Sequence, residues 1–131
     1  MKTKLSLLAA LLVLCLPVSA QTKHSMRAVS FAQTATGPTA TVSWTQPTGV
    51  PAGTTVTLFR CAGTPCTAPT SFTQLVTGVT ASGPYTDSTV TAGTYSYYAV
   101  NVNGTQTSPA SNIASGTLPL PAPTGLTVTA N

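Results

Sequence analysis

The residues that could carry out chemistry are few in this 131-residue sequence, and the scarcest type is the carboxylate. Asp87 is the one Asp or Glu, so general acid–base catalysis by paired carboxylates is excluded. His24 is the one histidine, and no motif such as G-x-S-x-G positions a serine nucleophile. The sequence therefore predicts no enzyme, no catalytic residue and no cofactor. Asp87 is instead expected to accept hydrogen bonds from backbone N–H groups at a turn, or to pair with an arginine.

Cys61 and Cys66, in "CAGTPC", are the next candidates for chemistry. We predict a structural disulfide that closes this short loop and stabilises the fold by about 2 kcal/mol. A pair of thiols that stays free or links to a partner is one alternative, and a redox pair is the other. A redox pair is expected as C-x-x-C at the start of a helix, which this spacing does not provide. No metal site is expected, because His24 and two thiols are too few ligands for zinc and one acid is too few for calcium.

Residues 1–20 have the pattern of a secretory signal peptide. Lys2 and Lys4 precede the apolar run "LSLLAALLVLCLPV", and "VSA" ends at Ala20 as a cleavage site. A lipoprotein signal at Cys15 is the alternative, but Leu14 occupies the position where a small residue is expected. We expect cleavage near Ala20, a secreted or cell-envelope protein, and no membrane span in the mature chain.

The charge that remains after residue 20 is small. Lys23, Arg27 and Arg60 stand against Asp87, which lowers the net charge from +4 for the whole chain to +2. Three scattered cations cannot neutralise several phosphates together, so nucleic acid is not an expected partner.

The rest of the chain is rich in Thr, Ser, Val and Gly and has no sustained helical periodicity, a composition typical of strands and turns. The loop 46–54 contains two prolines, Asn103–Gly104 is a hairpin signal, and Pro109 interrupts the last strand. Short runs between Gly and Pro residues predict strands at 25–33, 39–45, 54–60, 71–76, 85–90, 92–102 and 105–118. About seven such strands indicate an all-β fold, an immunoglobulin-like antiparallel β-sandwich.

Alternation along these strands assigns their faces. In 25–33, Met26 and Ala28 are expected opposite Arg27, Val29 and Phe31. In 54–60, the side expected to carry Val56, Leu58 and Arg60 is opposite that of Thr57 and Phe59. The predicted core consists of Trp44, Leu58, Leu75, Tyr95, Tyr97 and Ile113. A possible binding surface consists of Phe59, Phe72 and Tyr98, where exposed rings could stack on sugars.

Four stretches in order resemble the fibronectin type III family, in the form found in secreted bacterial proteins. They are "VSWTQP", "VTLFR" with "SFTQLVTG", "PYTDSTVTAGTYSYYAVNVNG" and "SPASNIASGTLP", and the resemblance covers residues 25–119. In that family a Tyr two residues after "GT" locks the corner before the F strand, but Ser96 stands there. Tyr95 could take this role, with Tyr97 and Ala99 inside. The other register places Tyr98, Val100 and Val102 inside, because a shift of one residue exchanges the faces.

The resemblance implies a domain at 21–119 that is non-catalytic and serves protein binding, adhesion or spacing. The loops 46–54 and 61–71 would carry its contacts. An accessory carbohydrate-binding module that uses exposed Tyr and Phe is the alternative, so the expected partner is an extracellular protein or a polysaccharide. We expect a monomer. Residues 120–131 form a Pro-rich linker and a strand-like tail, which could be disordered, fold back on this domain, or add to a strand edge of another molecule.

Overall fold

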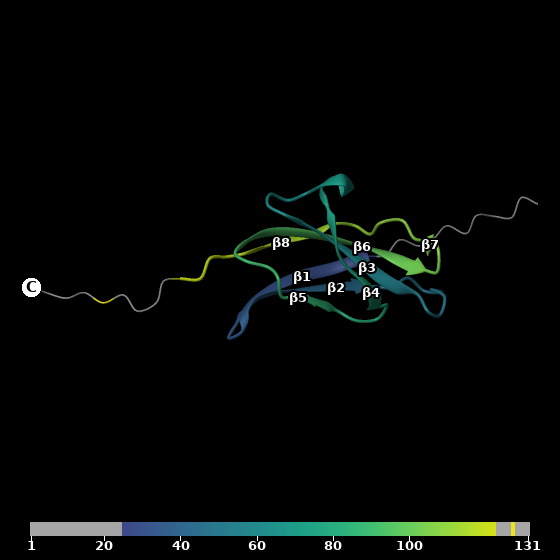
Figure 1. Ribbon diagram of the computed structural model, residues 1–131, viewed down its shortest axis with the longest axis horizontal. Helices are drawn as coiled ribbons and strands as arrows, with labels where there is room; N and C mark the ends of the chain where they lie inside the picture. Colours follow the sequence, from purple (N-terminus) through teal and green to yellow (C-terminus); the bar gives the residue numbers. More distant parts are fainter. Residues whose placement is uncertain (1–24, 123–126, 128–131) are drawn as a thin grey trace, which may run out of the picture.

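The computed structural model describes residues 25–122 and 127, and these residues form two antiparallel sheets packed face to face (Figure 1). The first sheet has the order β1 (Ser25–Thr34), β2 (Gly37–Thr45), β5 (Tyr85–Asp87). The second has the order β4 (Thr73–Thr80), β3 (Thr55–Ala62), β6 (Gly93–Asn103), and both β7 (Gln106–Thr107) and β8 (Ala114–Leu118) pair with the far edge of β6. The predicted all-β sandwich is confirmed. The predicted signal peptide, His24 and most of the predicted tail lie outside the described residues.

The core lies between the two sheets, where apolar side chains from both inner faces meet. Its buried members come from β1, β2, β3, β6 and β8 and from the segment before β6: Met26, Ala40, Val42, Val56, Leu58, Val90, Tyr95, Tyr97, Ala99 and Leu118. On β3, Val56 and Leu58 face inward as the alternation predicted.

The register of β6 places Tyr95, Tyr97 and Ala99 in the core, as the first of the two sequence registers proposed. The Tyr95 hydroxyl accepts a hydrogen bond from the Thr91 backbone N–H at 2.9 Å. Tyr95 therefore locks the chain four residues upstream, the arrangement of a tyrosine corner in an immunoglobulin-like sandwich.

A β-bulge in β1 changes the faces predicted for its first half. The pairing with β2 shifts between Met26 and Ala28, so Arg27 is the extra residue. Met26 is buried, Ala28 is exposed, and Phe31 packs against the core on the same side as Met26. The Phe31 ring lies against Gly116 of β8, a contact that leaves no room for a Cβ atom at this glycine. Simple alternation placed Met26 opposite Phe31, and the bulge is why that assignment is wrong.

Another irregularity lets β4 continue past residue 76, where the predicted strand ends. The predicted strand 71–76 is found at Thr73–Thr80, and Pro69–Ser71 is a turn of 3-10 helix. The pairing with β3 shifts around Gly78, which has φ 75°. A glycine accepts this left-handed conformation without a steric penalty, so the strand passes Gly78 as a bulge.

The turn after β6 lies one residue later than expected. Asn103 pairs with Gln106 inside the ladder, and Gly104, with φ 57°, is the residue with positive φ. The predicted final strand 105–118 is divided into β7 and β8, with Pro109 in the segment between them. A proline lacks the N–H that a continuous ladder needs, which accounts for the division.

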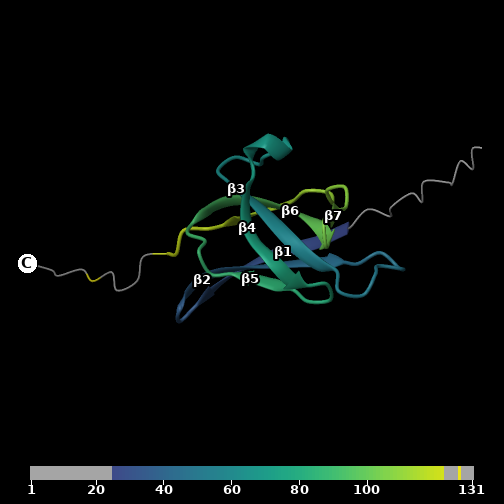
Figure 2. The ribbon, with the colours of Figure 1, turned by 45° about the vertical axis from the view of Figure 1, so that its right-hand side comes forward.

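The loops gather at separate places on the sandwich. The loop 46–54 lies at the right-hand end in Figure 1, and the β1–β2 turn lies at the opposite end. The connection from β3 to β4, which contains the 3-10 turn, projects from the top in both Figure 1 and Figure 2. Within residues 25–122 and 127, no helix is long and apolar enough to cross a membrane.

Candidate functional site

The two cysteines of the fold form a disulfide, which confirms the predicted pairing. Cys61 at the end of β3 is bonded to Cys66, with the Cα atoms 6.3 Å apart. The Cys66 backbone N–H donates to the Ser96 hydroxyl on β6 at 3.1 Å, and this hydroxyl lies 2.8 Å from that of Ser115 on β8. The projecting loop is therefore tied at its base to β3 by the disulfide and to β6 by the Cys66 hydrogen bond.

Asp87 lies at the junction of the two sheets, where it is only 1% exposed. Its Oδ2 accepts from Arg60 Nη1 at 2.8 Å and from the Tyr97 hydroxyl at 3.1 Å. Its Oδ1 accepts from the backbone N–H and the hydroxyl of Thr89, at 2.9 and 2.7 Å. Both roles expected for Asp87, a turn acceptor and an arginine partner, occur together.

The protonation behaviour of this cluster follows from its contacts. Burial alone would raise the pKa of Asp87, but the hydrogen bonds from Thr89 and the hydrogen bond and charge of Arg60 outweigh it, so the pKa is lowered. Burial, together with the neighbouring Asp87 charge, raises the pKa of the Tyr97 hydroxyl well above its usual value. The Arg60 guanidinium also lies 5.6 Å from the centre of the Tyr95 ring. Asp87 is therefore an ionised structural group rather than a proton donor at neutral pH.

The aromatic residues predicted as a possible binding surface are brought together on the outer face of the second sheet. Phe59 and Tyr98 are directly paired across β3 and β6, with their rings stacked 4.7 Å apart. Phe72 meets the Tyr98 ring edge-on at 4.9 Å. Tyr98 is only 9% exposed, because its neighbours cover it. Tyr98 therefore offers no open ring face for stacking, whereas Phe59 and Phe72 remain partly exposed.

The residues predicted for the core divide into three groups. Leu58, Tyr95 and Tyr97 are buried in the core cluster. Trp44 and Leu75 are partly buried and pack against it. Ile113 is half-buried just before β8, where the neighbouring Ala114 makes the contact with the core.

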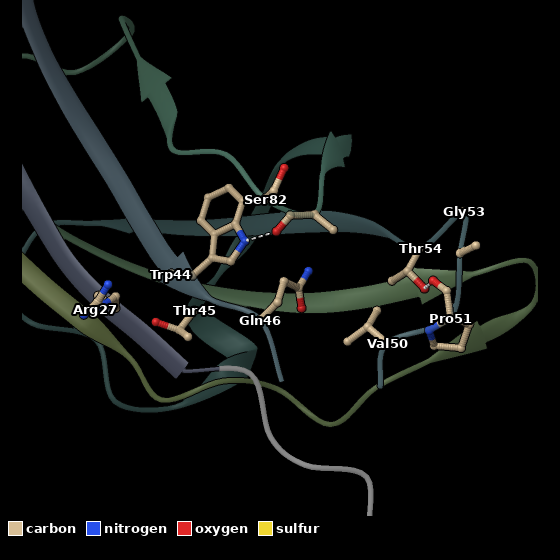
Figure 3. A pocket seen from close by; sticks show the side chains of 11 residues that line it. Arg27, Trp44, Thr45, Gln46, Val50, Pro51, Gly53, Thr54 and Ser82 are labelled. Carbon is tan, nitrogen blue, oxygen red and sulfur yellow. Dashed lines mark hydrogen bonds between the residues drawn. The ribbon is translucent and has the colours of Figure 1, made fainter. Parts of the chain in front are cut away.

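An open groove of about 470 Å³ lies at the end of the sandwich that carries the loop 46–54. Its lining includes Trp44, whose indole N–H donates to the Ala81 carbonyl at 3.0 Å (Figure 3). Figure 3 shows Arg27 at one end, Gln46 in the middle, and Val50 and Pro51 towards the other end. The volume lies within the range of ligand pockets, about 300–1,000 Å³.

The loop that forms the groove is held in place by side chains of β6. Gln46 and Asn101 exchange two amide hydrogen bonds, each 3.0 Å long. Asn103 donates to the Ala52 carbonyl at 3.1 Å and to the Thr54 hydroxyl at 2.9 Å. Because these bonds fix the loop before any ligand arrives, binding there would lose little conformational entropy.

Arg27 is the charged residue of the groove. It projects from the bulge of β1 and is exposed. Among the described residues, Arg27 and Arg60 are the only cationic side chains, and Arg60 forms a salt bridge with Asp87. The chain has no second Asp or Glu with which Arg27 could pair.

Sequence reasoning placed Trp44 in the core and Arg27 on the face of Val29 and Phe31, and so did not predict that Trp44 and Arg27 line one groove. The signal available was the loop 46–54, already expected to carry contacts. Over the described part of the chain, no three His, Cys, Asp or Glu side chains gather in a way that could hold a metal ion.

Comparison with known proteins supports the fold. No protein-family model and no curated protein matches the chain. The chain is similar to a solved structure, an Fn3-like protein from Clostridium thermocellum, with 25% sequence identity and a TM-score of 0.51. The match covers 69% of this chain and 86% of that one. The architecture is therefore that of an Fn3-like β-sandwich module.

Proposed function

We propose that the chain is a secreted, non-catalytic module of the fibronectin type III family that binds another protein. Its recognition surface is the groove beside the loop 46–54. In this proposal residues 1–20 are removed, 21–119 form the domain, and 120–131 are a linker with a strand-like tail. The module acts as a monomer outside the cell, where it serves adhesion or spacing.

The observation that carries this proposal is the preorganised groove. Two side chains of β6, Asn101 and Asn103, hold the loop 46–54 through four hydrogen bonds, two of which are exchanged with Gln46 of the loop. Contact residues are commonly presented on loops that a rigid sandwich positions. The disulfide at Cys61–Cys66 supports an oxidising compartment outside the cytosol.

The chemistry of Asp87 supports the non-catalytic part of the proposal. Its carboxylate is almost fully buried and both oxygens accept hydrogen bonds from the protein itself. General acid–base catalysis needs a group within reach of the substrate proton, and Asp87 is enclosed between the sheets.

The alternative, a carbohydrate-binding module on exposed aromatic rings, has weaker support. Tyr98 is 9% exposed and lies between Phe59 and Phe72. Inside the groove, the Gln46 amide is already paired with Asn101. Few polar groups remain there to exchange hydrogen bonds with sugar hydroxyls.

The test compares three forms of the purified protein as immobilised bait for envelope and supernatant proteins of the organism that encodes it. They are the unchanged chain, Ala52→Gln in the groove, and Ala35→Gln in the exposed turn at the opposite end. We expect one set of proteins to be retained by the unchanged chain and by Ala35→Gln, and to be lost with Ala52→Gln. Equal retention by all three would contradict the groove as the binding surface. Retention of nothing by any folded form would contradict the binding function.

A further inference from the structure

Charged side chains are few in the described part of the fold, and Arg27 is the one whose charge is not paired with Asp87. Asp87 is the chain's single acidic side chain, it is 1% exposed, and it is bonded to Arg60. The surface formed by the described residues therefore carries no exposed carboxylate side chain. Arg27 has no possible Asp or Glu partner within its own chain apart from this enclosed group.

Arg27 also lies where apolar surface is gathered. The groove that it borders contains the Trp44 indole and the side chains of Val50, Pro51 and Ala81. Figure 3 shows Arg27 on one side of Trp44, with Val50 and Pro51 farther along. A cation beside an indole and aliphatic side chains is complementary to a ligand that combines negative charge with apolar groups.

The polar groups of the groove help to decide between a peptide and a polysaccharide as its ligand. The Gln46 amide is paired with Asn101, and the Thr54 hydroxyl donates to the Pro51 carbonyl at 2.8 Å. Since these two groups already have partners, Thr45 and Ser82 are the polar side chains of the groove that remain besides Arg27. This favours a peptide over a polysaccharide, whose recognition relies on many hydrogen bonds to hydroxyl groups.

We propose that the groove binds an acidic segment of a partner protein, with a carboxylate on the Arg27 guanidinium and a neighbouring apolar side chain against Trp44 and Val50. The carboxylate is the partner that Arg27 lacks in its own chain. This inference rests on the proposed function and names the chemistry of the partner.

Binding in the groove can be followed by the fluorescence of Trp44, because Trp44 is the only tryptophan in the chain and lines the groove. Its fluorescence is followed in the whole purified protein during titration with capped eight-residue peptides of Glu, Leu and Ser. The matched peptides carry Gln in place of every Glu. We expect the acidic peptide to change the emission of Trp44 and to bind about tenfold more tightly than the Gln peptide, the effect of one charge-assisted contact.

Two variants distinguish binding at Arg27 from a general attraction between the acidic peptide and a positively charged protein. Arg27→Ala is expected to lower the affinity for the acidic peptide about tenfold and to leave that for the Gln peptide unchanged. Arg27→Ala combined with Gln33→Arg restores the net charge but moves the cation to the far, exposed end of β1. We expect this double variant to bind as weakly as Arg27→Ala.

The remaining outcomes would overturn the inference. Equal affinity for the Glu and Gln peptides, no response to either, or full affinity in the double variant would each contradict it. Binding of polygalacturonate without binding of the peptides would assign the groove to an acidic polysaccharide instead. If Ala52→Gln still abolishes protein capture while the acidic peptide fails, the protein-binding function stands and the inferred acidic partner falls.

Discussion

Replacing Asp87 by Asn tests whether a single carboxylate controls the stability of this fold. The Asn side chain keeps the shape and can still accept from Thr89. It would, however, turn an N–H₂ group or an uncharged oxygen towards Arg60 and Tyr97, which both donate to Oδ2. Removing one partner of a buried ion pair costs about 3 kcal/mol or more. For a domain of this size that corresponds to a fall in Tm of about 12–24 °C.

The dependence on pH is a sharper test than the Tm at neutral pH. The pKa of Asp87 is lowered in the folded protein, so its contribution is fully present above the unfolded pKa, about 3.9, and is lost as the pH falls through the folded value. Because no other Asp or Glu exists in the chain, we expect a constant Tm from pH 7 down to about pH 4.5 and a fall below that. One group can change the free energy of unfolding by at most about 1.4 kcal/mol per pH unit.

The assay is thermal unfolding followed by circular dichroism between pH 2 and pH 8, at constant ionic strength, for the unchanged chain, Asp87→Asn and Arg60→Met. Asp87→Asn should lose the acid-dependent step. Arg60→Met removes a contact that lowers the Asp87 pKa, so its step should move to higher pH. A loss of stability in the unchanged chain between pH 7 and pH 5, or an undiminished acid step in Asp87→Asn, would refute this reasoning.

Three further predictions concern other contacts of the fold. Tyr97→Phe should lower the free energy of unfolding by about 1–2 kcal/mol at neutral pH. Because the pKa of Tyr97 is raised in the folded protein, the stability that the Tyr97 hydroxyl contributes is present below about pH 10 and is lost above it. The variant should therefore lose less stability than the unchanged chain when unfolding is measured at alkaline pH. Gly116→Ala should destabilise the fold by about 1–3 kcal/mol, because the new methyl group would meet the Phe31 ring; urea unfolding measures it, and no change would show that the ring moves aside freely. Replacing both Cys61 and Cys66 by Ser should lower the free energy of unfolding by about 2 kcal/mol, and an equal Tm for the variant and the disulfide-bonded chain would contradict a stabilising disulfide.

Much of the sandwich could be predicted because its information is local. Prolines and glycines mark the strand ends, and alternation on β3 separates the inward Val56 and Leu58 from the outward Phe59. The sequence allowed two registers of β6 at the tyrosine corner, because Tyr95 precedes Ser96 and Tyr97 follows it. The hydrogen bond from Thr91 to Tyr95 accompanies the register found, and that bond depends on a turn whose exact length the sequence does not specify.

Two of the misplaced features, the faces of β1 and the end of β4, have one cause in common, which is an irregular ladder. The extra residue Arg27 exchanges the faces of β1, and Gly78 carries β4 through a bulge beyond the predicted strand end at residue 76. A bulge is decided by the partner strand as well as by the bulged one, so alternation within one strand cannot locate it. The groove was missed for the same reason, because the bulge at Arg27 is what places the guanidinium near Trp44.

Most reactive groups of the described chain are used to hold the fold together. The groove is therefore the place where we look for function. The carboxylate of Asp87 joins the two sheets, the Cys61–Cys66 disulfide closes a loop, and Tyr98 is covered by its aromatic neighbours. Each of these groups is already satisfied inside the molecule. Arg27 differs, because its charge is exposed beside apolar surface and the chain contains no carboxylate side chain able to reach it without dismantling the Asp87 cluster. An exposed ion pair contributes little to stability, so under the proposed function Arg27 serves recognition of the partner rather than stability of the fold.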